Sequence, residues 1–136
     1  MVFNETPKAT IWFKVGPKKV GLRGQQLKYV ARPFYGPKQS EQDTIDQIVR
    51  NYDGLRAYQV HGVVEAIVND FQNQLMHGHP VKIAGLGTFR LSFNSVSHDN
   101  PDDFTAADIK NPHIVFIPDP KLKRMIRERV VFEKQP

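Results

Sequence analysis

The sequence predicts an α+β fold. Apolar and polar residues alternate in residues 9–15, which is the period of a β-strand. Apolar residues recur at helical spacing in residues 56–77, and this segment is followed by a short strand, a Gly-x-Gly corner at residues 85–87 and a second alternating strand. This order of helix, stop, strand, glycine corner and strand is unusual, and it is the most specific structural signal in the chain.

The composition fits one domain, or one domain with an extension. The chain has 136 residues, of which 40% are hydrophobic, and it contains no cysteine. No disulfide framework or cysteine-based metal site is therefore expected. There is no apolar run of about 18 residues, and residues 1–8 lack the apolar core of a signal peptide. We expect a soluble cytoplasmic protein with no membrane partner.

The net charge of +5 is distributed unevenly. Residues 1–40 contain eight Lys or Arg and one acid, residues 41–80 contain two bases and six acids, and residues 81–136 contain nine bases and seven acids. A strongly basic segment favours a polyanionic partner, with nucleic acid the first candidate. The alternative is a basic protein whose charge serves only solubility.

The N-terminal 40 residues are predicted to form a β extension. Strand patterns at residues 9–15 and 27–32 are separated by the glycine- and proline-containing breakers at residues 16–19 and 21–24. Together they predict a β-hairpin or strand pair, followed by a linker at residues 36–39.

Two helices are predicted next. Ser40 and Asp43 have the spacing of an N-terminal capping pair, and the short helix they begin ends at Asp53-Gly54. The second helix covers about residues 56–77 and is ended by residues 78–80. No other long helix is available to cover its apolar face, so we predict a dimer. That face consists of Val60, Val63, Val64, Ile67, Val68, Phe71 and Leu75.

The remaining segments complete the α+β pattern. Residues 94–108 are mostly polar and acidic, without Lys or Arg, and residues 114–117 are typical of a buried strand. Asp119 and Pro120 have the types preferred at the cap and first position of a helix, and the helix that follows is rich in Lys and Arg. Residues 130–132 either extend this helix or begin a terminal strand.

From about residue 44 to residue 129, the sequence resembles the HU/integration host factor family of bacterial histone-like DNA-binding proteins. The corner Gly85-Leu86-Gly87-Thr88-Phe89 and the later motif Phe116-Ile117-Pro118-Asp119-Pro120-Lys121-Leu122-Lys123 carry this resemblance. Asp119 replaces a glycine of the family motif. The N-terminal extension and residues 105–110 are similar to the divergent HU-like proteins of Bacteroidetes.

The resemblance implies an HU-like domain at residues 41–136 that forms an intertwined homodimer. Helices would form its base, and a β-saddle would carry two arms, at about residues 94–110, into the minor groove of DNA. The implied protein is nucleoid-associated and non-enzymatic. It binds double-stranded DNA mainly through phosphates, with low sequence specificity, and can bend it. No cofactor or small-molecule substrate is implied.

The resemblance and the charges select eight candidate DNA-binding residues. The cationic side chains would displace counterions from phosphates, although each could instead only solvate a surface. The glycine corner could offer peptide N–H groups to a phosphate or simply bend a strand. The candidates are Lys82, Gly87, Arg90, Asn100, Pro101, Lys110, Lys121 and Lys123.

The predicted arm departs from the family pattern. The family tip has Arg-Asn-Pro, whereas this chain has Asp99-Asn100-Pro101, and the arm contains four aspartates. Pro101 could wedge between base pairs, or Asn100-Pro101 could be only a turn. The acidic arm also supports an alternative function, an HU-fold architectural or protein-interaction dimer with weakened DNA binding. The basic N-terminal segment could compensate by following the DNA backbone, or could only protect a sheet edge with lysines. Its cations are Lys14, Lys18, Lys19, Arg23 and Lys28.

No catalytic or metal-binding pattern is present. The five histidines have no paired metal spacing with carboxylates, and no nucleophile motif occurs. We therefore expect neither catalytic residues nor a metal site.

Overall fold

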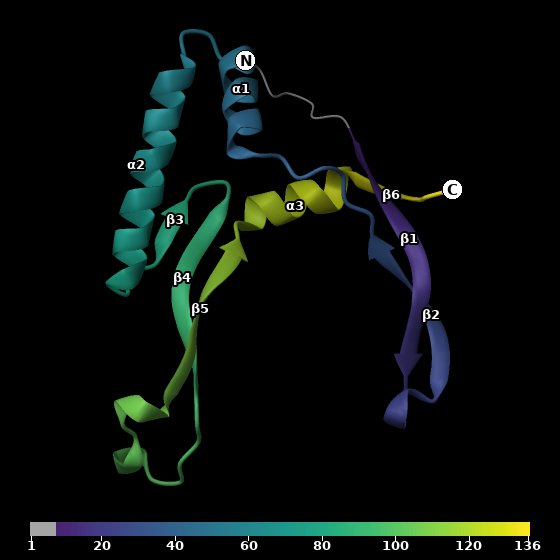
Figure 1. Cartoon of the computed structure of the whole chain (residues 1–136), viewed down its shortest axis with the longest axis vertical. Coiled ribbons are helices and arrows are strands. Elements are labelled where there is room, and N and C mark those ends of the chain that lie inside the picture. The colour runs from purple at the N-terminus through teal and green to yellow at the C-terminus, as the bar shows by residue number, and fades with distance from the viewer. Residues whose placement is uncertain (1–7) are drawn as a thin grey trace. The chain divides into compact units, whose positions relative to one another are not determined.

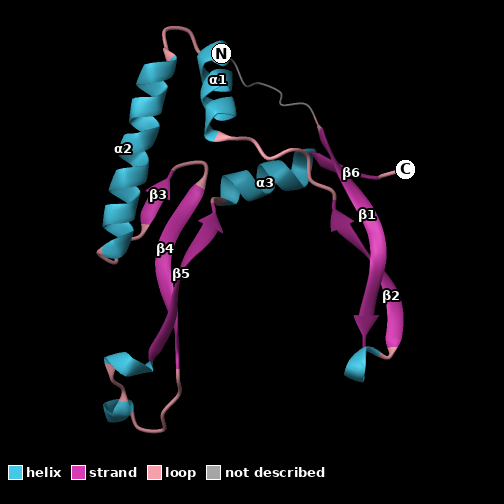
Figure 2. Ribbon diagram, viewed as in Figure 1, coloured by secondary structure: helices cyan, strands magenta, loops and turns pink. Residues whose placement is uncertain are grey.

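A computed structural model describes residues 8–136 and shows a mixed α+β fold (Figures 1 and 2). Within these residues lie three α-helices and two three-stranded sheets, which confirms the predicted fold class. The chain divides into two units, one made of residues 1–54 and 125–136 and the other of residues 55–124. The functional division into residues 1–40 and 41–136 stays a prediction.

The first unit is built on a sheet with the strand order β2-β1-β6. The strands β1 (Ala9–Val20) and β2 (Gln26–Pro33) pair antiparallel, whereas β6 (Val130–Lys134) pairs parallel with residues 9–13 of β1. Residues 130–132 therefore begin a terminal strand, the second of the two predicted alternatives. The C-terminal strand makes the N-terminal strand pair part of a three-stranded sheet.

The first strand is longer than predicted. It continues through Gly16 and Pro17 to Val20, and the turn lies at residues 21–25 instead. Proline removes a backbone donor and is tolerated where a strand has a neighbour on only one side. The pairing of β1 with β6 ends at Phe13, so Pro17 lies where β1 has only β2 beside it. The predicted break at residues 16–19 was wrong for this reason.

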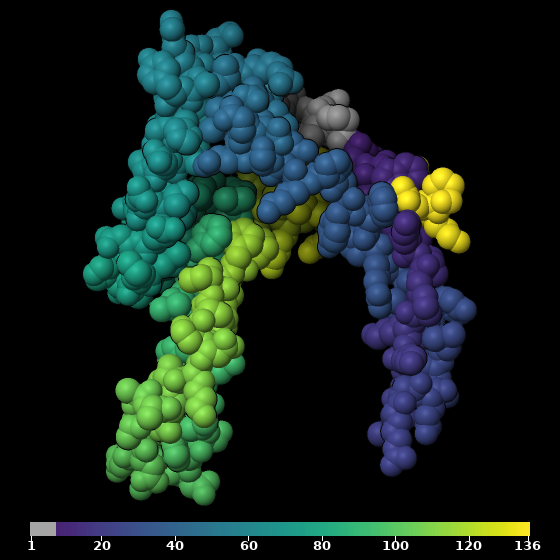
Figure 3. All heavy atoms as spheres, in the orientation of Figure 1, coloured from purple at the N-terminus to yellow at the C-terminus, as the bar shows by residue number. Residues whose placement is uncertain are grey.

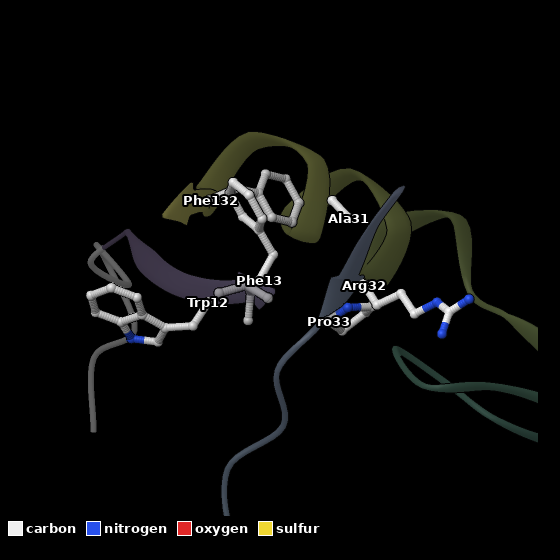
Figure 4. Close-up of a pocket in the computed structure, with 7 residues that line it drawn as sticks. Trp12, Phe13, Ala31, Arg32, Pro33 and Phe132 are labelled. Carbon is white, nitrogen blue, oxygen red and sulfur yellow. The ribbon is translucent and has the colours of Figure 1, made fainter. Parts of the chain in front are cut away.

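Mostly apolar side chains of this sheet line an open cavity of about 290 Å³. Its lining combines residues of all three strands, and Figure 4 shows Phe13 and Phe132 on one side and the Arg32 guanidinium directed away from them. The cavity therefore lies among the small apolar cluster that holds the first and last strands of the chain together. The lining residues are Ile11, Trp12, Phe13, Ala31, Arg32, Pro33 and Phe132.

The helix α1 (Glu41–Asn51) also belongs to the first unit and begins with the predicted capping box. The Asp43 N–H donates to the Ser40 hydroxyl at 3.1 Å, and the Ser40 N–H donates to the Asp43 carboxylate at 3.0 Å. The Ser40 N–H is the largest cause that holds the pKa of Asp43 below its ordinary value, because its hydrogen bond favours the ionised carboxylate, and the Ser40 side chain lowers this pKa further. The helix therefore begins where the sequence places it.

The second unit packs α2 (Ala57–Met76) against an antiparallel sheet with the strand order β3-β4-β5. Phe89 links the two layers, because its ring lies 6.1 Å from that of Phe71 on the helix and 4.8 Å from that of Phe116 on β5. Such tilted aromatic pairs stabilise beyond their buried area. The strands are β3 (Val81–Ile83), β4 (Gly87–Ser95) and β5 (Ile109–Pro118). The helix α3 (Pro120–Arg129) follows β5.

The single chain buries few apolar side chains. Among the described residues, only Ile45, Val60 and Val81 count as buried hydrophobic side chains. On α2, Ile67 keeps 42% and Val63 59% of its surface exposed. Contiguous apolar surface of this kind is typical of protein interfaces. No helix in the described part of the chain is long and apolar enough to cross a membrane.

Candidate nucleic-acid interface

The glycine corner connects β3, β4 and the start of α3 within the second unit. The Leu86 N–H donates to the Ile83 carbonyl at 3.0 Å, which closes the turn between β3 and β4. The Leu86 carbonyl accepts the Asp119 N–H at 3.0 Å, which places the start of α3 beside the corner. Gly85 has a φ of 83°, a conformation that costs little only for glycine. The two family motifs, far apart in sequence, therefore meet in space.

Gly87 has a packing requirement of its own. A Cβ atom built on Gly87 would lie 2.4 Å from the Ile117 carbonyl oxygen and 2.6 Å from the Phe116 ring. The absence of a side chain therefore lets β4 approach β5 closely. This contact supports the strand-bend interpretation of Gly87 and leaves its proposed role at a phosphate untested.

A Gly87→Ala substitution is expected to destabilise the protein by about 3 kcal/mol, because the new methyl group overlaps backbone that cannot move freely. Gly85→Ala is the matched control, because a Cβ there meets nothing within 4 Å and only the positive φ is strained. We expect it to cost about 1 kcal/mol. Urea denaturation of both variants checks the difference, and equal losses would show that the close strand approach is not the cause.

Four of the predicted cations lie near this corner or on its strands. Lys82 on β3 pairs with Thr88, and Arg90 on β4 pairs with Val115 on β5. Lys121 and Lys123 lie in the first turn of α3. All four side chains are exposed, and within residues 8–136 none forms an ion pair with a carboxylate. Their charges are therefore free to meet a polyanion.

The start of α3 is already capped by Asp119. Its carboxylate accepts the Lys121 N–H at 2.8 Å, and its backbone carbonyl accepts the Lys123 N–H at 3.0 Å. The positive end of a helix attracts anions, and here a side-chain carboxylate occupies it. A phosphate near Lys121 and Lys123 would therefore meet the charge of Asp119.

The predicted arm ends in a compact tip, drawn in green in Figure 3. The Asp108 carboxylate lies 3.1 Å from the His98 ring nitrogen and accepts the Thr105 N–H at 2.8 Å. The Phe104 ring packs edge-on against His98 at 4.8 Å. The Val96 N–H also donates to the Asp108 carbonyl at 3.1 Å. These contacts close residues 96–108 on themselves.

Asn100 and Pro101 form a turn within this tip. The Asn100 side chain accepts the Asp102 N–H at 3.0 Å and caps a short 3₁₀ helix that begins at Pro101. Lys110 is exposed at the base of the arm, where it pairs with Asn94 across β4 and β5. The eight predicted residues therefore separate into a group around the corner and α3 and a group of three on the arm.

Comparison with known proteins assigns the family. The sequence matches the HU-HIG family, described as an HU domain fused to wHTH, Ig, or Glycine-rich motif, over residues 10–134. The chain belongs to the HU-HIG family. The match covers both units, so the family assignment includes the N-terminal strands as well as the part with the HU motifs.

A solved structure from Bacteroides vulgatus has the same fold. It is a crystal structure of a candidate bacterial DNA-binding protein, 15% identical in sequence, with a TM-score of 0.66. The similarity covers 95% of this chain and 50% of that protein, so the chain spans about half of its length. A search of curated proteins found no match. The family and the mixed α+β fold class are therefore those that the sequence predicted.

Proposed function

We propose that this HU-HIG chain is a non-enzymatic, nucleoid-associated protein that binds duplex DNA through backbone phosphates with low sequence specificity. The unpaired cations around the glycine corner carry this proposal. Lys82, Arg90, Lys121 and Lys123 are exposed, and none has a carboxylate partner in the part of the chain that the structure describes. Contacts to phosphates supply affinity without reading bases, because every duplex presents the same backbone.

The proposed binding unit is a homodimer with a saddle and two arms. The exposed apolar surface of α2 supports this assembly, since a single chain leaves it uncovered. The sheet also exposes apolar side chains, including Phe93 at 53% and Ile114 at 52%. A second copy would bury such surface and present a second set of the same cations.

A second candidate function is an HU-fold architectural or protein-interaction dimer with weakened DNA binding. The arm supports this alternative, because Asp99, Asp102, Asp103 and Asp108 give it an acidic character. Carboxylates are repelled by phosphates, so an acidic arm opposes entry into the minor groove.

Titration of two labelled duplexes of unrelated sequence at low salt separates these functions. The proposed function predicts binding to both with affinities that agree within about threefold, because phosphate contacts carry no sequence information. Negligible binding at low salt would reject it in favour of the architectural dimer. A strong preference for one sequence would reject the low-specificity part.

An Asp119→Asn substitution is expected to raise DNA affinity by about fivefold, because it removes one repulsive charge of about 1 kcal/mol beside a phosphate. Asparagine is also a good helix cap, so the fold should be retained. Filter binding or anisotropy with the same duplex measures the change, and circular dichroism confirms the helix content. Unchanged affinity would place the DNA away from the start of α3.

A Pro101→Ala substitution tests the arm. If the turn at Asn100-Pro101 stays outside the DNA, the bend angle at full occupancy is expected to be unchanged, since no apolar wedge is lost. Energy transfer between dyes at the two ends of a duplex measures the bend. A clear loss of bending would instead show insertion of Pro101 between base pairs.

A further inference from the structure

The distal part of β1 and β2 forms a two-stranded ribbon. The pairing with β6 stops at Phe13, whereas β1 and β2 continue to pair from there to Val20 and Gln26 (Figure 1). The turn at the tip contains Arg23, which has a φ of 65°. Residues 14–32 are therefore paired only with each other within the described sheet.

The register of the ribbon collects cations on one face. Residues opposite each other in an antiparallel pair share a face, and side chains alternate between faces along a strand. Lys14 lies opposite Arg32, and Lys18 lies opposite Lys28. The two positions on β1 are four residues apart, so all four cations lie on the same face, which we call the cationic face. All four side chains are exposed.

The other face of the ribbon is mainly apolar. It holds the pairs Val15 with Ala31 and Pro17 with Tyr29. Lys19, opposite Leu27, is the only cation in the paired register of this face. Adjacent lysines at positions 18 and 19 therefore point to opposite sides of the same strand.

The cationic face is unfavourable for the free protein. Like charges directly opposite in a sheet destabilise it, and no Asp or Glu occurs in residues 8–40 to compensate. The Lys14 ammonium lies 4.9 Å from the centre of the Phe34 ring, which offers it a weak partner. Among residues 8–136, no carboxylate lies within ion-pair distance of Lys18 or Lys28. Charged residues can protect a sheet edge without forming two pairs of like charges opposite each other. Edge protection alone therefore does not explain these two pairs.

We propose that the cationic face, made of Lys14, Lys18, Lys28 and Arg32, binds the phosphates of duplex DNA. The two opposed pairs are separated by four residues, or about 13 Å at the rise of a β-strand, so they can contact separate phosphates. A two-stranded ribbon also fits the major groove, which is about 12 Å wide. This inference rests on the proposed function and adds a DNA-binding surface outside the corner and the arm.

In DNA binding, the positive charge of the cationic face would offset the negative charge of the acidic arm. The arm between residues 94 and 110 has four aspartates and one lysine, whereas residues 8–40 have eight Lys or Arg and no acid. DNA is favoured over an anionic membrane as partner because the same chain belongs to a family built on an HU domain. Binding to anionic vesicles is therefore a competing outcome of the test.

The test compares Lys18→Gln with Lys19→Gln, which remove the same charge from opposite faces of the ribbon. Each lost phosphate contact is expected to lower affinity about eightfold at about 0.1 M salt and to reduce the slope of log K against log salt by about 0.9. We expect these losses for Lys18→Gln in each chain of the dimer that contacts DNA, and twice the slope change for Lys18→Gln/Lys28→Gln. Lys19→Gln is expected to change affinity less than twofold.

Folding of the variants is checked without DNA. Removal of opposed like charges is expected to leave the unfolding temperature of Lys18→Gln/Lys28→Gln unchanged or higher. If this double variant were less stable, the two single variants would still decide the question. Vesicles containing about 30% anionic lipid provide the second ligand, because basic segments also bind such surfaces.

Each outcome decides between the two proposals. Equal losses of DNA affinity for Lys18→Gln and Lys19→Gln would show that only the net charge matters. That result would reject the cationic face as a DNA-binding surface. An unchanged slope in the double variant, with the unmodified protein still binding DNA, would also reject it but leave the proposed function intact. Absence of DNA binding by the unmodified protein at low salt would reject both. If the Lys18 and Lys28 variants lost binding to vesicles but kept their binding to DNA, the cationic face would be assigned to a membrane and the inference would be overturned.

Discussion

An Ile67→Asp substitution on α2 is expected to disrupt the folded dimer and to cost more than about 3 kcal/mol per chain. Ile67 keeps 42% of its surface exposed in the single chain, where a charge could still reach water. In a dimer that covers α2, the same charge would be buried without a partner. A two-fold assembly would contain the change twice. Light scattering and thermal unfolding together measure the loss.

The control is Asn69→Asp, which adds the same charge at an exposed position of the same helix. It is expected to change stability by less than about 0.5 kcal/mol, as is usual for surface positions. If the unmodified protein were a stable monomer, or if Ile67→Asp behaved like Asn69→Asp, the proposed dimer would be rejected.

An Arg90→Ala/Lys123→Ala double variant is expected to weaken DNA binding by at least about 60-fold at about 0.1 M salt, because each chain of the dimer that contacts DNA loses two phosphate contacts at about eightfold each. The loss should be the same for unrelated sequences, since these side chains are proposed to contact the backbone only. Fluorescence anisotropy with two duplexes measures it.

The matched control removes two exposed cations from outside the proposed surfaces, as Lys38→Ala/Arg50→Ala. This variant has the same net charge as Arg90→Ala/Lys123→Ala but is expected to lose less than about threefold in affinity, because distant exposed charges are largely screened. Equal losses would mean that the cations near the corner act only through net charge.

Elements with local signals could be predicted from the sequence. The capping pair of Ser40 and Asp43 begins α1, and Pro120 begins α3, as expected from their types. The periodic stripe from Val60 to Leu75 lies within α2. These signals lie within one element, so they are visible without knowledge of the fold.

Features that depend on contacts between distant segments could not be predicted. The parallel pairing of β6 with β1 joins the two ends of the chain and has no local pattern. Pro17 suggested a break because the sequence does not show that β6 pairs with β1 only as far as Phe13, which leaves Pro17 with β2 as its only neighbouring strand. The packing requirement at Gly87 likewise depends on Phe116 and Ile117 on another strand.

The candidate site shows the same distinction. Motif resemblance selected Lys82, Arg90, Lys121 and Lys123, and the Leu86 to Asp119 hydrogen bond explains why the two motifs are near each other. Arg32 was not selected, because its membership of the cationic face follows from the register with Lys14. Residue spacing along a single strand could not show that pairing.

The most direct test of phosphate-mediated DNA binding is the salt dependence of affinity for the unmodified protein. We expect log K to fall linearly with log salt, with a slope steeper than about −3.6, because the four cations near the corner alone would each release about 0.9 counterion. Anisotropy titrations of one duplex between about 0.05 and 0.2 M salt give this slope. A slope near zero with measurable binding would contradict a phosphate-based interface, and undetectable binding at the lowest salt would contradict DNA binding itself.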